Sequence, residues 1–247
     1  MKINVLSENL SSRIAAGEVV ERPFSVVKEL VENSIDANST KVFIEIENGG
    51  LELIKITDNG DGIPSSDLPV AFERFATSKI DNSSDLTSIQ TLGFRGEALP
   101  SIASVSIVNA ISKTKNENMG SVFDSKFLNE KKIKRISCNT GTSISVMKLF
   151  SNVPARLKFI KSANSEVLKI HNLINYFSLV YPNIDFQLIT DGKLKLDTTG
   201  SSNILDIYKM IYGIYSKNNL LLIDDENESS NYKISGLIGS PSMYKSN

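Results

Sequence analysis

The chain has 247 residues, of which 40% are hydrophobic, and its formal net charge is −1. A chain of this size can bury a core large enough for one domain, or a domain and a half, without disulfides. Its near-neutral charge gives no global sign of binding to nucleic acid or to a membrane surface. One cysteine, Cys138, excludes an internal disulfide framework and fits a reducing compartment.

Other residue types narrow the chemistry further. His171 is the one histidine, which excludes a His-rich zinc site. It lies among apolar residues at helical spacing, so a structural helix residue is favoured over a Ser-His-Asp triad. The N-terminal stretch MKINVLSENLSSR lacks the apolar core of a signal peptide, and no stretch reaches the ~18 apolar residues of a membrane helix. We therefore expect an intracellular protein without membrane contact, in the bacterial cytoplasm or alternatively in a nucleus or organelle.

The N-terminal half alternates helices with paired strands. Residues 10–16 predict a short helix, and a second helix begins at Pro23, whose missing N–H is tolerated in a first turn. The stretch KVFIEIENGGLELIKITDNG predicts a hairpin about Asn48-Gly49-Gly50. Then follow a predicted helix near 66–75, a polar loop, a GFRG turn, a helix from about Glu97 and a strand SVSIVNAIS.

The C-terminal half adds strands, a long helix and a second hairpin. Strands are predicted in FDSKFLN, KIKRISC and GTSISVMKL, a helix over 164–181, and a hairpin at Asp191-Gly192. Because hairpins dominate, we expect an α+β fold: a mixed, mostly antiparallel sheet with helices on one face. The polar run TTGSSN marks a predicted boundary between a first domain, 1–200, and the beginning of a truncated second subdomain, 201–247, with a helix at 204–215 and two strands.

The helix begun by Pro23 carries a polar stripe. Its members stand at i, i+3, i+4 and i+7, opposite an apolar arc, and are Glu29, Glu32, Asn33 and Asp36. A solvated face usually mixes lysine with glutamate, whereas this stripe holds three carboxylates and a carboxamide without a cation among them. The stripe is therefore either a solvated face or one side of a site whose positive charge comes from elsewhere.

The stretch ITDNGDGI places Asp58 at the end of a strand. A calcium loop is excluded, because the register that puts Asp61 and Gly62 at positions five and six puts Thr57 and Leu68 where acids are required. A plain turn remains open. In the alternative interpretation, Asp58 accepts a hydrogen bond from a ligand donor such as an exocyclic amine, and the glycines let a flat ligand approach the backbone.

Three further stretches are compatible with an anion site. In LGFRGEALPSI, Gly93 and Gly96 precede a helix, where N–H groups can face an anion, although a structural turn explains them equally well. Thr77, Ser78 and Lys79 offer two hydroxyls and a cation, and Gly141-Thr142 begins a strand that could line a pocket floor. No P-loop is present, and no GxGxxG follows a strand.

Together these stretches occur in the order and spacing of one family. The segment IAAGEVVERPFSVVKELVENSIDA (14–37) resembles the N-terminal signature of the MutL mismatch-repair ATPases, and DNGDGI, ATSKI, GFRGEAL and GTSISV resemble its later motifs. LFSNVPARLKF (149–159) resembles a segment that separates MutL from the gyrase, chaperone and histidine-kinase ATPases. The resemblance covers about residues 3–159 and then thins to a hydrophobic pattern.

The resemblance implies a site for ATP and Mg²⁺. Asn33 would ligate Mg²⁺, and Glu29 would orient or deprotonate the attacking water. Asp58 would accept from the adenine amine, with support from Thr142. Residues 93–99 would form a lid over the phosphates, and residues 77–79 would brace it. The other implied nucleotide-binding positions are Gly62, Thr77, Ser78, Lys79, Gly93, Phe94, Arg95, Gly96, Glu97, Ala98 and Leu99.

The chain departs from the family pattern in places. Phe75 stands where a histidine is frequent and Pro100 where a small residue is usual, and neither change removes a proposed ligand. The resemblance gives no role to Glu32 and Asp36, for which solvation or indirect support is expected. The sequence ends before the family's segment that supplies a lysine to the γ-phosphate and before its dimerisation domain, so ATP binding is better supported than hydrolysis.

The leading prediction is a MutL-type mismatch-repair fragment that uses Mg-ATP as a switch for dimer closure, with slow hydrolysis in the complete protein. The implied partners are a second MutL chain, identical or not, the mismatch-recognition protein MutS and a downstream nuclease or helicase. Basic stretches at 126–135 and 154–161 imply weak, salt-sensitive DNA binding or, alternatively, solvated faces. A non-hydrolysing nucleotide- or partner-binding module and the ATPase part of a type II topoisomerase remain as alternatives.

Overall fold

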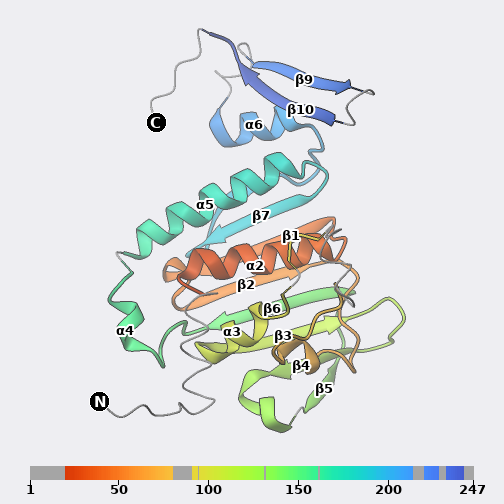
Figure 1. Ribbon diagram of the computed structural model, residues 1–247, viewed down its shortest axis with the longest axis vertical. Coiled ribbons are helices and arrows are strands. Elements are labelled where there is room, and N and C mark those ends of the chain that lie inside the picture. The colour runs from red at the N-terminus through yellow and green to blue at the C-terminus, as the bar shows by residue number, and fades with distance from the viewer. Residues whose placement is uncertain are drawn as a thin grey trace.

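The computed structural model describes residues 20–79, 91–93, 95–130, 132–160, 162–213, 220–227 and 232–241. Its strands are β1 (Lys41–Glu47), β2 (Leu53–Asp58), β3 (Ile107–Lys113), β4 (Gly120–Asp124), β5 (Ile133–Ile136), β6 (Gly141–Met147), β7 (Asp185–Thr190), β8 (Lys193–Asp197), β9 (Leu220–Asn227) and β10 (Tyr232–Gly239). The first eight form one sheet in the order β5-β4-β3-β6-β2-β1-β7-β8, and β9 pairs with β10 (Figure 1). Only the β1–β7 pair is parallel among these strands, so the predicted mixed, mostly antiparallel sheet is confirmed.

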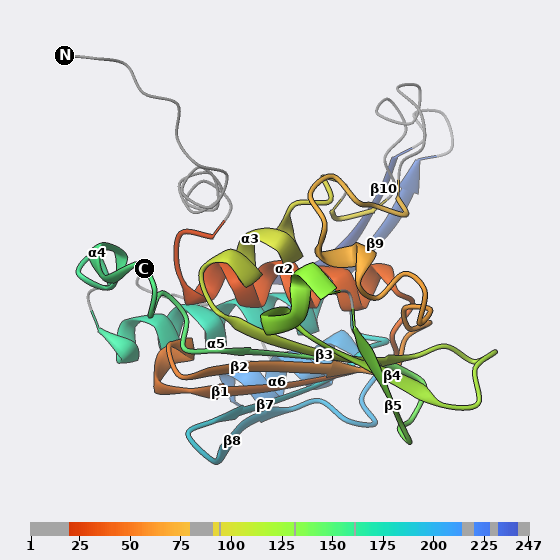
Figure 2. The ribbon, with the colours of Figure 1, turned by 90° about the horizontal axis from the view of Figure 1, so that it is seen from below.

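Helices cover one face of the large sheet, as predicted. They are α2 (Pro23–Asp36), α3 (Ala98–Ser104), α4 (Pro154–Leu157), α5 (Ala163–Val180) and α6 (Ile204–Tyr212), with short 3₁₀ helices η1 (Asn48–Gly50), η2 (Val70–Phe72) and η4 (Ser125–Glu130). Figure 2 shows α2 and α3 lying over the same side of the strands. The α5 helix packs between α2 and β7, and α6 packs on α5. Among the described residues, none of the helices is both long and apolar enough to cross a bilayer.

The strand register explains why the helices gather on that face. Because side chains alternate along a strand, paired residues share a face of the sheet. One row of directly paired, buried apolar residues crosses seven of the strands. It consists of Phe123, Ala110, Ile144, Ile56, Ile44, Leu188 and Leu196. This row forms the floor of the core on which the helices pack.

The α2 helix follows its sequence pattern closely. It begins at Pro23, as predicted, and its buried residues include Val27, Leu30 and Val31 on the predicted apolar arc. Each buried aliphatic side chain contributes about 1.5–3 kcal/mol relative to an exposed one. Asn38 ends the segment in a left-handed conformation, with φ 58°. The apolar arc thus fixes α2 on the sheet and turns its opposite stripe outward from the core.

Two predicted elements are wrong. The helix expected at 66–75 is a series of turns and the short η2, because Pro69 has no N–H to donate and disfavours a helical residue before it. The strand expected in FDSKFLN ends at Asp124 and continues as η4. There Asp124 accepts from the Lys126 N–H and Ser125 from the Val108 N–H, so side chains replace the ladder partners. The helix predicted at 10–16 lies outside the described residues.

The segment TTGSSN begins inside the first domain. Thr198 is fully buried, its N–H donates to the carbonyl of Phe186 at 3.0 Å, and its hydroxyl oxygen accepts from the Phe186 N–H at 2.9 Å. The buried Ile207 of α6 then packs the following helix onto the fold. The domain boundary at 200/201 stays a prediction.

His171 has a structural position in α5. Its Nε2 lies 3.0 Å from the hydroxyl of Thr190 on β7, and burial lowers the pKa of the ring. It is not among the residues that line the cavity described below. The prediction of a structural helix residue is confirmed.

Candidate functional site

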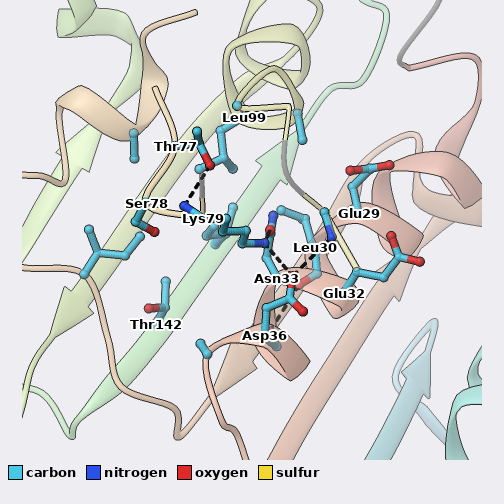
Figure 3. Close-up of a pocket in the computed structure, with 18 of the residues that line it drawn as sticks. Glu29, Leu30, Glu32, Asn33, Asp36, Thr77, Ser78, Lys79, Leu99 and Thr142 are labelled. Atoms are coloured by element: carbon cyan, nitrogen blue, oxygen red, sulfur yellow. Dashed lines mark hydrogen bonds and ion pairs between the residues drawn. The ribbon is translucent and has the colours of Figure 1, made fainter. Parts of the chain in front are cut away.

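A cavity of about 810 Å³ lies beside the polar stripe of α2 (Figure 3). Residues from α2, β2, β6, η2 and the start of α3 line it, together with the loops before and after η2 and the loop that leads into α3. Every predicted site residue that the structure describes is in this lining: Glu29, Asn33, Asp58, Gly62, Thr77, Ser78, Lys79, Gly93, Arg95, Gly96, Glu97, Ala98, Leu99 and Thr142. Phe94 lies outside the described residues. The structure therefore brings the predicted set together, while the role of each member stays a prediction.

The polar stripe of α2 has two cations beside it, and one of them comes from elsewhere in the chain, in agreement with the second of the two sequence interpretations. Lys28, on the same helix, lies with its Nζ 2.8 Å from Glu32 Oε1. Lys79, from a loop far along the chain, lies with its Nζ 2.5 Å from Asp36 Oδ2 and 3.0 Å from Asn33 Oδ1. The i, i+4 spacing could have predicted the first pair. No local pattern could have predicted the second.

Asp36 holds the loops around the cavity to α2. Besides Lys79, it accepts from the backbone N–H of Leu92 at 3.0 Å and of Gly93 at 3.2 Å. Its side chain is only 7% exposed, so of the two roles expected for Asp36, solvation or indirect support, the structure agrees with indirect support. The N–H groups of residues 92 and 93 therefore do face an anion, but this anion is the protein's own carboxylate and not a ligand.

The adjoining loops also support each other directly. The N–H of Phe75 donates to the carbonyl of Gly96 at 3.0 Å. Gly96 has φ 64°, and a Cβ there would lie 2.6 Å from the carbonyl oxygen of Ala76. Thr77 accepts from the Lys79 N–H at 3.2 Å, which shapes the turn before the lysine. This contact between the segments fits the predicted brace.

Asp58 is an acceptor held in place by three donors. Its Oδ1 accepts from the N–H of Gly60 at 2.9 Å and of Thr142 at 3.1 Å, and its Oδ2 accepts from the Ser34 hydroxyl at 2.9 Å. Burial raises the pKa of this carboxyl, while the three hydrogen bonds oppose the rise. Sequence reasoning missed Ser34, whose position one helical turn after Leu30 places it on the inner side of α2.

Two glycines near Asp58 allow other segments of the backbone to approach closely. Gly62 has φ 77°, and a Cβ there would collide with the carbonyl of Lys113. Gly141 has φ 119°, and a Cβ would collide with the carbonyl of Asp58. These two glycines therefore permit close packing between chain segments, and the approach of a flat ligand to the glycines of ITDNGDGI stays a prediction. At Gly93 a Cβ would meet nothing nearer than 3.5 Å, so that glycine does leave space at the cavity.

Glu29 is half-buried one helical turn before Asn33, and Figure 3 shows both on the same part of α2. Burial raises the pKa of its carboxyl, the charge of Lys28 opposes the rise, and the charge of Glu32 adds to it. A carboxylate with a raised pKa accepts a proton more readily than an ordinary one. The group is therefore chemically suited to act on a water.

Comparison with known proteins agrees with this geometry. Residues 21–153, more than half of the chain, match the family of histidine kinase-, DNA gyrase B- and HSP90-like ATPases. The solved MutL ATPase domain of Aquifex aeolicus, in complex with ADP, is 30% identical, with a TM-score of 0.62 over 84% of this chain and 73% of that one. The chain belongs to the MutL family.

Two curated MutL relatives match along the whole chain. The DNA mismatch repair protein MutL of Halothermothrix orenii is 47% identical over 100% of the chain, and that of Streptococcus uberis is also 47% identical over 100%. The chain spans 38% and 37% of the lengths of these two proteins. Membership in the MutL family decides against the type II topoisomerase alternative.

Proposed function

We propose that this MutL chain binds ATP with Mg²⁺ in the cavity, and that the protein hydrolyses ATP slowly. The observation that carries the proposal is that one cavity gathers Asp58, Asn33 and Glu29. They are, respectively, an acceptor fixed by protein donors, an oxygen turned toward a positive charge, and a carboxylate of raised pKa. These are the three kinds of group that an adenine base, a metal–phosphate pair and an attacking water require.

The residues fit a metal that arrives with a nucleotide. Among the described residues, no group of three or more His, Cys, Asp or Glu side chains could hold a metal ion without further ligands. Asn33 offers one hard oxygen, and Mg²⁺ is commonly bound through one or two protein oxygens, with substrate phosphates and waters completing its shell. Bound there, the metal would offset negative charge on the phosphates. Asn33 is thus the residue that would hold it.

The remaining groups orient the nucleotide and the water. Asp58 accepts from the exocyclic amine of adenine, whereas guanine presents an acceptor at the equivalent position and would be repelled. Lys79 and Arg95 supply positive charge at the cavity lining. Glu29, when ionised, accepts a proton from the water that attacks the terminal phosphate.

The proposal extends to the wider function of a complete MutL protein. Nucleotide binding would reorganise the loops that Asp36 ties to α2, and in a complete MutL protein this change favours dimer closure and engagement of MutS and a downstream nuclease or helicase. DNA contact is weak and directed to phosphates. Basic residues of the two candidate stretches already have protein partners: Lys132 pairs with Glu130, and Arg156 donates to the Val20 carbonyl.

Titration of the chain with ADP and GDP in the presence of Mg²⁺ tests the proposal. ADP is expected to bind more tightly than GDP, and Asp58→Ala should remove most of that preference. Equal affinity for the two nucleotides would overturn the assignment of Asp58. Single-turnover hydrolysis of bound ATP separates the ATPase from the alternative, a non-hydrolysing nucleotide-binding module, which would bind ATP without cleaving it.

A further inference from the structure

Lys79 lies at the place where Asn33 presents its oxygen to a positive charge (Figure 3). Its ammonium is bonded to Asn33 Oδ1 at 3.0 Å and to Asp36 Oδ2 at 2.5 Å. The Lys79 and Asp36 side chains are 20% and 7% exposed, so water screens this ion pair less than it would a pair on the surface. The protein itself therefore supplies a cation to this part of the cavity.

The two partners differ in how firmly they are held. Asp36 accepts from the N–H of Leu92 and of Gly93 in addition to Lys79, so its carboxylate is fixed by backbone donors on another segment. Lys79 is attached through a flexible four-carbon stem and can place its ammonium elsewhere in the cavity that it lines. In any rearrangement at this point, the lysine is the partner that moves.

A metal at Asn33 and Lys79 in its present position would repel each other. A Mg²⁺ ion on Asn33 Oδ1 would lie ~2.1 Å from that oxygen. Lys79 Nζ is 3.0 Å from the same oxygen, so the two cations would be no more than about 5 Å apart in a poorly screened site, where their repulsion is strong. This repulsion favours the release of one of them from the oxygen.

We propose that Lys79 is the resident counter-cation of the Asn33–Asp36 pair and that metal–nucleotide binding proceeds by exchange. Asn33 Oδ1 loses the Lys79 N–H donor and takes the metal, and the released ammonium donates to a phosphate oxygen in the same cavity. The inference rests on the proposed function, because the phosphate is that of the bound nucleotide. Lys79 thereby acts as a positioning residue with two opposite effects. It opposes a divalent ion that arrives alone and favours one that arrives with phosphate.

Removal of the Lys79 charge should change two affinities in opposite directions, the affinity for a metal ion alone and the affinity for a metal–nucleotide. Lys79→Met should bind Mn²⁺ alone more tightly than the wild type, by about tenfold, within the usual range of coupling between two sites. The same variant should bind ADP in saturating Mg²⁺ more weakly. A lysine that only maintains the fold would weaken both, so the split of signs identifies the exchange. Mn²⁺ binding is measured by electron paramagnetic resonance of the free ion, and ADP binding by calorimetry.

Further variants show whether charge at this place is the cause. Lys79→Arg keeps the charge and should bind Mn²⁺ like the wild type. Lys79→Met combined with Asp36→Asn should lose the gain, because the carboxylate that the metal would neutralise is gone. Lys55→Met is the matched control: it removes one lysine from an ion pair with Glu45 on the sheet, outside the cavity lining, and should change neither affinity. If Lys79→Met does not fold, Lys79→Gln gives the same test.

An unchanged or weaker Mn²⁺ affinity in Lys79→Met, with ADP binding intact in the wild type, would overturn the exchange and leave the nucleotide site standing. A gain that persists in the double variant, or that also appears in Lys79→Arg, would overturn it as well. Failure of the wild type to bind ADP in Mg²⁺ would overturn the proposed function itself, whatever the Mn²⁺ result.

Discussion

Ser34 offers a direct test of how the protein holds Asp58. Its buried hydroxyl lies 2.9 Å from Asp58 Oδ2 and 3.2 Å from the Leu30 carbonyl, so the shorter contact is the one to a carboxylate. A hydrogen bond to a charged group contributes about 1.5–3 kcal/mol, and exchange of Ser for Ala in a helix returns up to about 0.5 kcal/mol. Ser34→Ala is therefore expected to lower the free energy of unfolding by about 1–2 kcal/mol at neutral pH.

The pH dependence of the stability change in Ser34→Ala shows whether Asp58 is the hydrogen-bond partner that matters. Because burial raises the folded-state pKa of Asp58, the carboxyl contributes stability at pH below its unfolded-state pKa, and this contribution is lost as pH rises through the folded value. Ser34→Ala removes a donor to the ionised form and raises that pKa further. The difference between variant and wild type should thus be full at neutral pH and shrink in acid, where Asp58 is protonated.

Urea unfolding from acid to neutral pH measures this difference. Ser178→Ala is the matched control, since Ser178 is equally buried in a helix and donates to the Ile174 carbonyl at 2.8 Å, a neutral acceptor. Its effect should be about 0–1 kcal/mol and independent of pH. If Ser34→Ala costs the same stability at all pH values, the Ser34–Asp58 bond is not the one that matters and the account of the Asp58 pocket is wrong.

Three other predictions concern separate parts of the molecule. Glu29→Gln should abolish ATP turnover while ADP still binds. The wild-type rate of hydrolysis should rise with pH through the raised pKa of Glu29, and a rate independent of pH would exclude Glu29 as the base. Gly141→Ala should cost about 3 kcal/mol or more in urea unfolding, because it adds a steric collision to the strain of a positive φ. Gly192→Ala should cost only about 1–2 kcal/mol, because φ is also positive there but the space is open. Equal effects would contradict the packing argument. Hydrogen bonds from Ser65 and Thr114 lower the pKa of Glu117 to about 2, so its contribution to stability should be present above its ordinary pKa and be lost as pH falls from 4.5 toward 2; an acid-unfolding curve unchanged by Glu117→Gln would refute this.

Features set by local periodicity could be predicted from the sequence. The apolar arc of α2 and its polar stripe follow from spacing alone, and the hairpin at Asp191-Gly192 follows from two residues that tolerate positive φ, here 48° and 72°. The gathering of the motif residues in one cavity could also be predicted. The family resemblance carries information about distant contacts, which single stretches of sequence do not.

Features that depend on tertiary contacts could not be predicted. Lys79 reaches α2 from a position 43 residues after Asp36, and nothing in the lysine's own neighbourhood indicates that partner. Pro69, by contrast, is a local signal against a helix at 66–75, because it has no N–H to donate. Gly62 and Gly141 stand in motifs that the sequence shows, yet a Cβ on either would meet a carbonyl group of another chain segment, which only the fold reveals.

The central claim is that Asn33 holds a metal-bound nucleotide in this cavity, and titration of ADP with and without Mg²⁺ tests it most directly. The wild type should bind ADP much more tightly with Mg²⁺ than without it, and Asn33→Ala should lose that dependence on the metal while its fold, checked by thermal unfolding, is retained. An Asn33→Ala variant with the same Mg²⁺-dependent binding curve as the wild type would contradict the account.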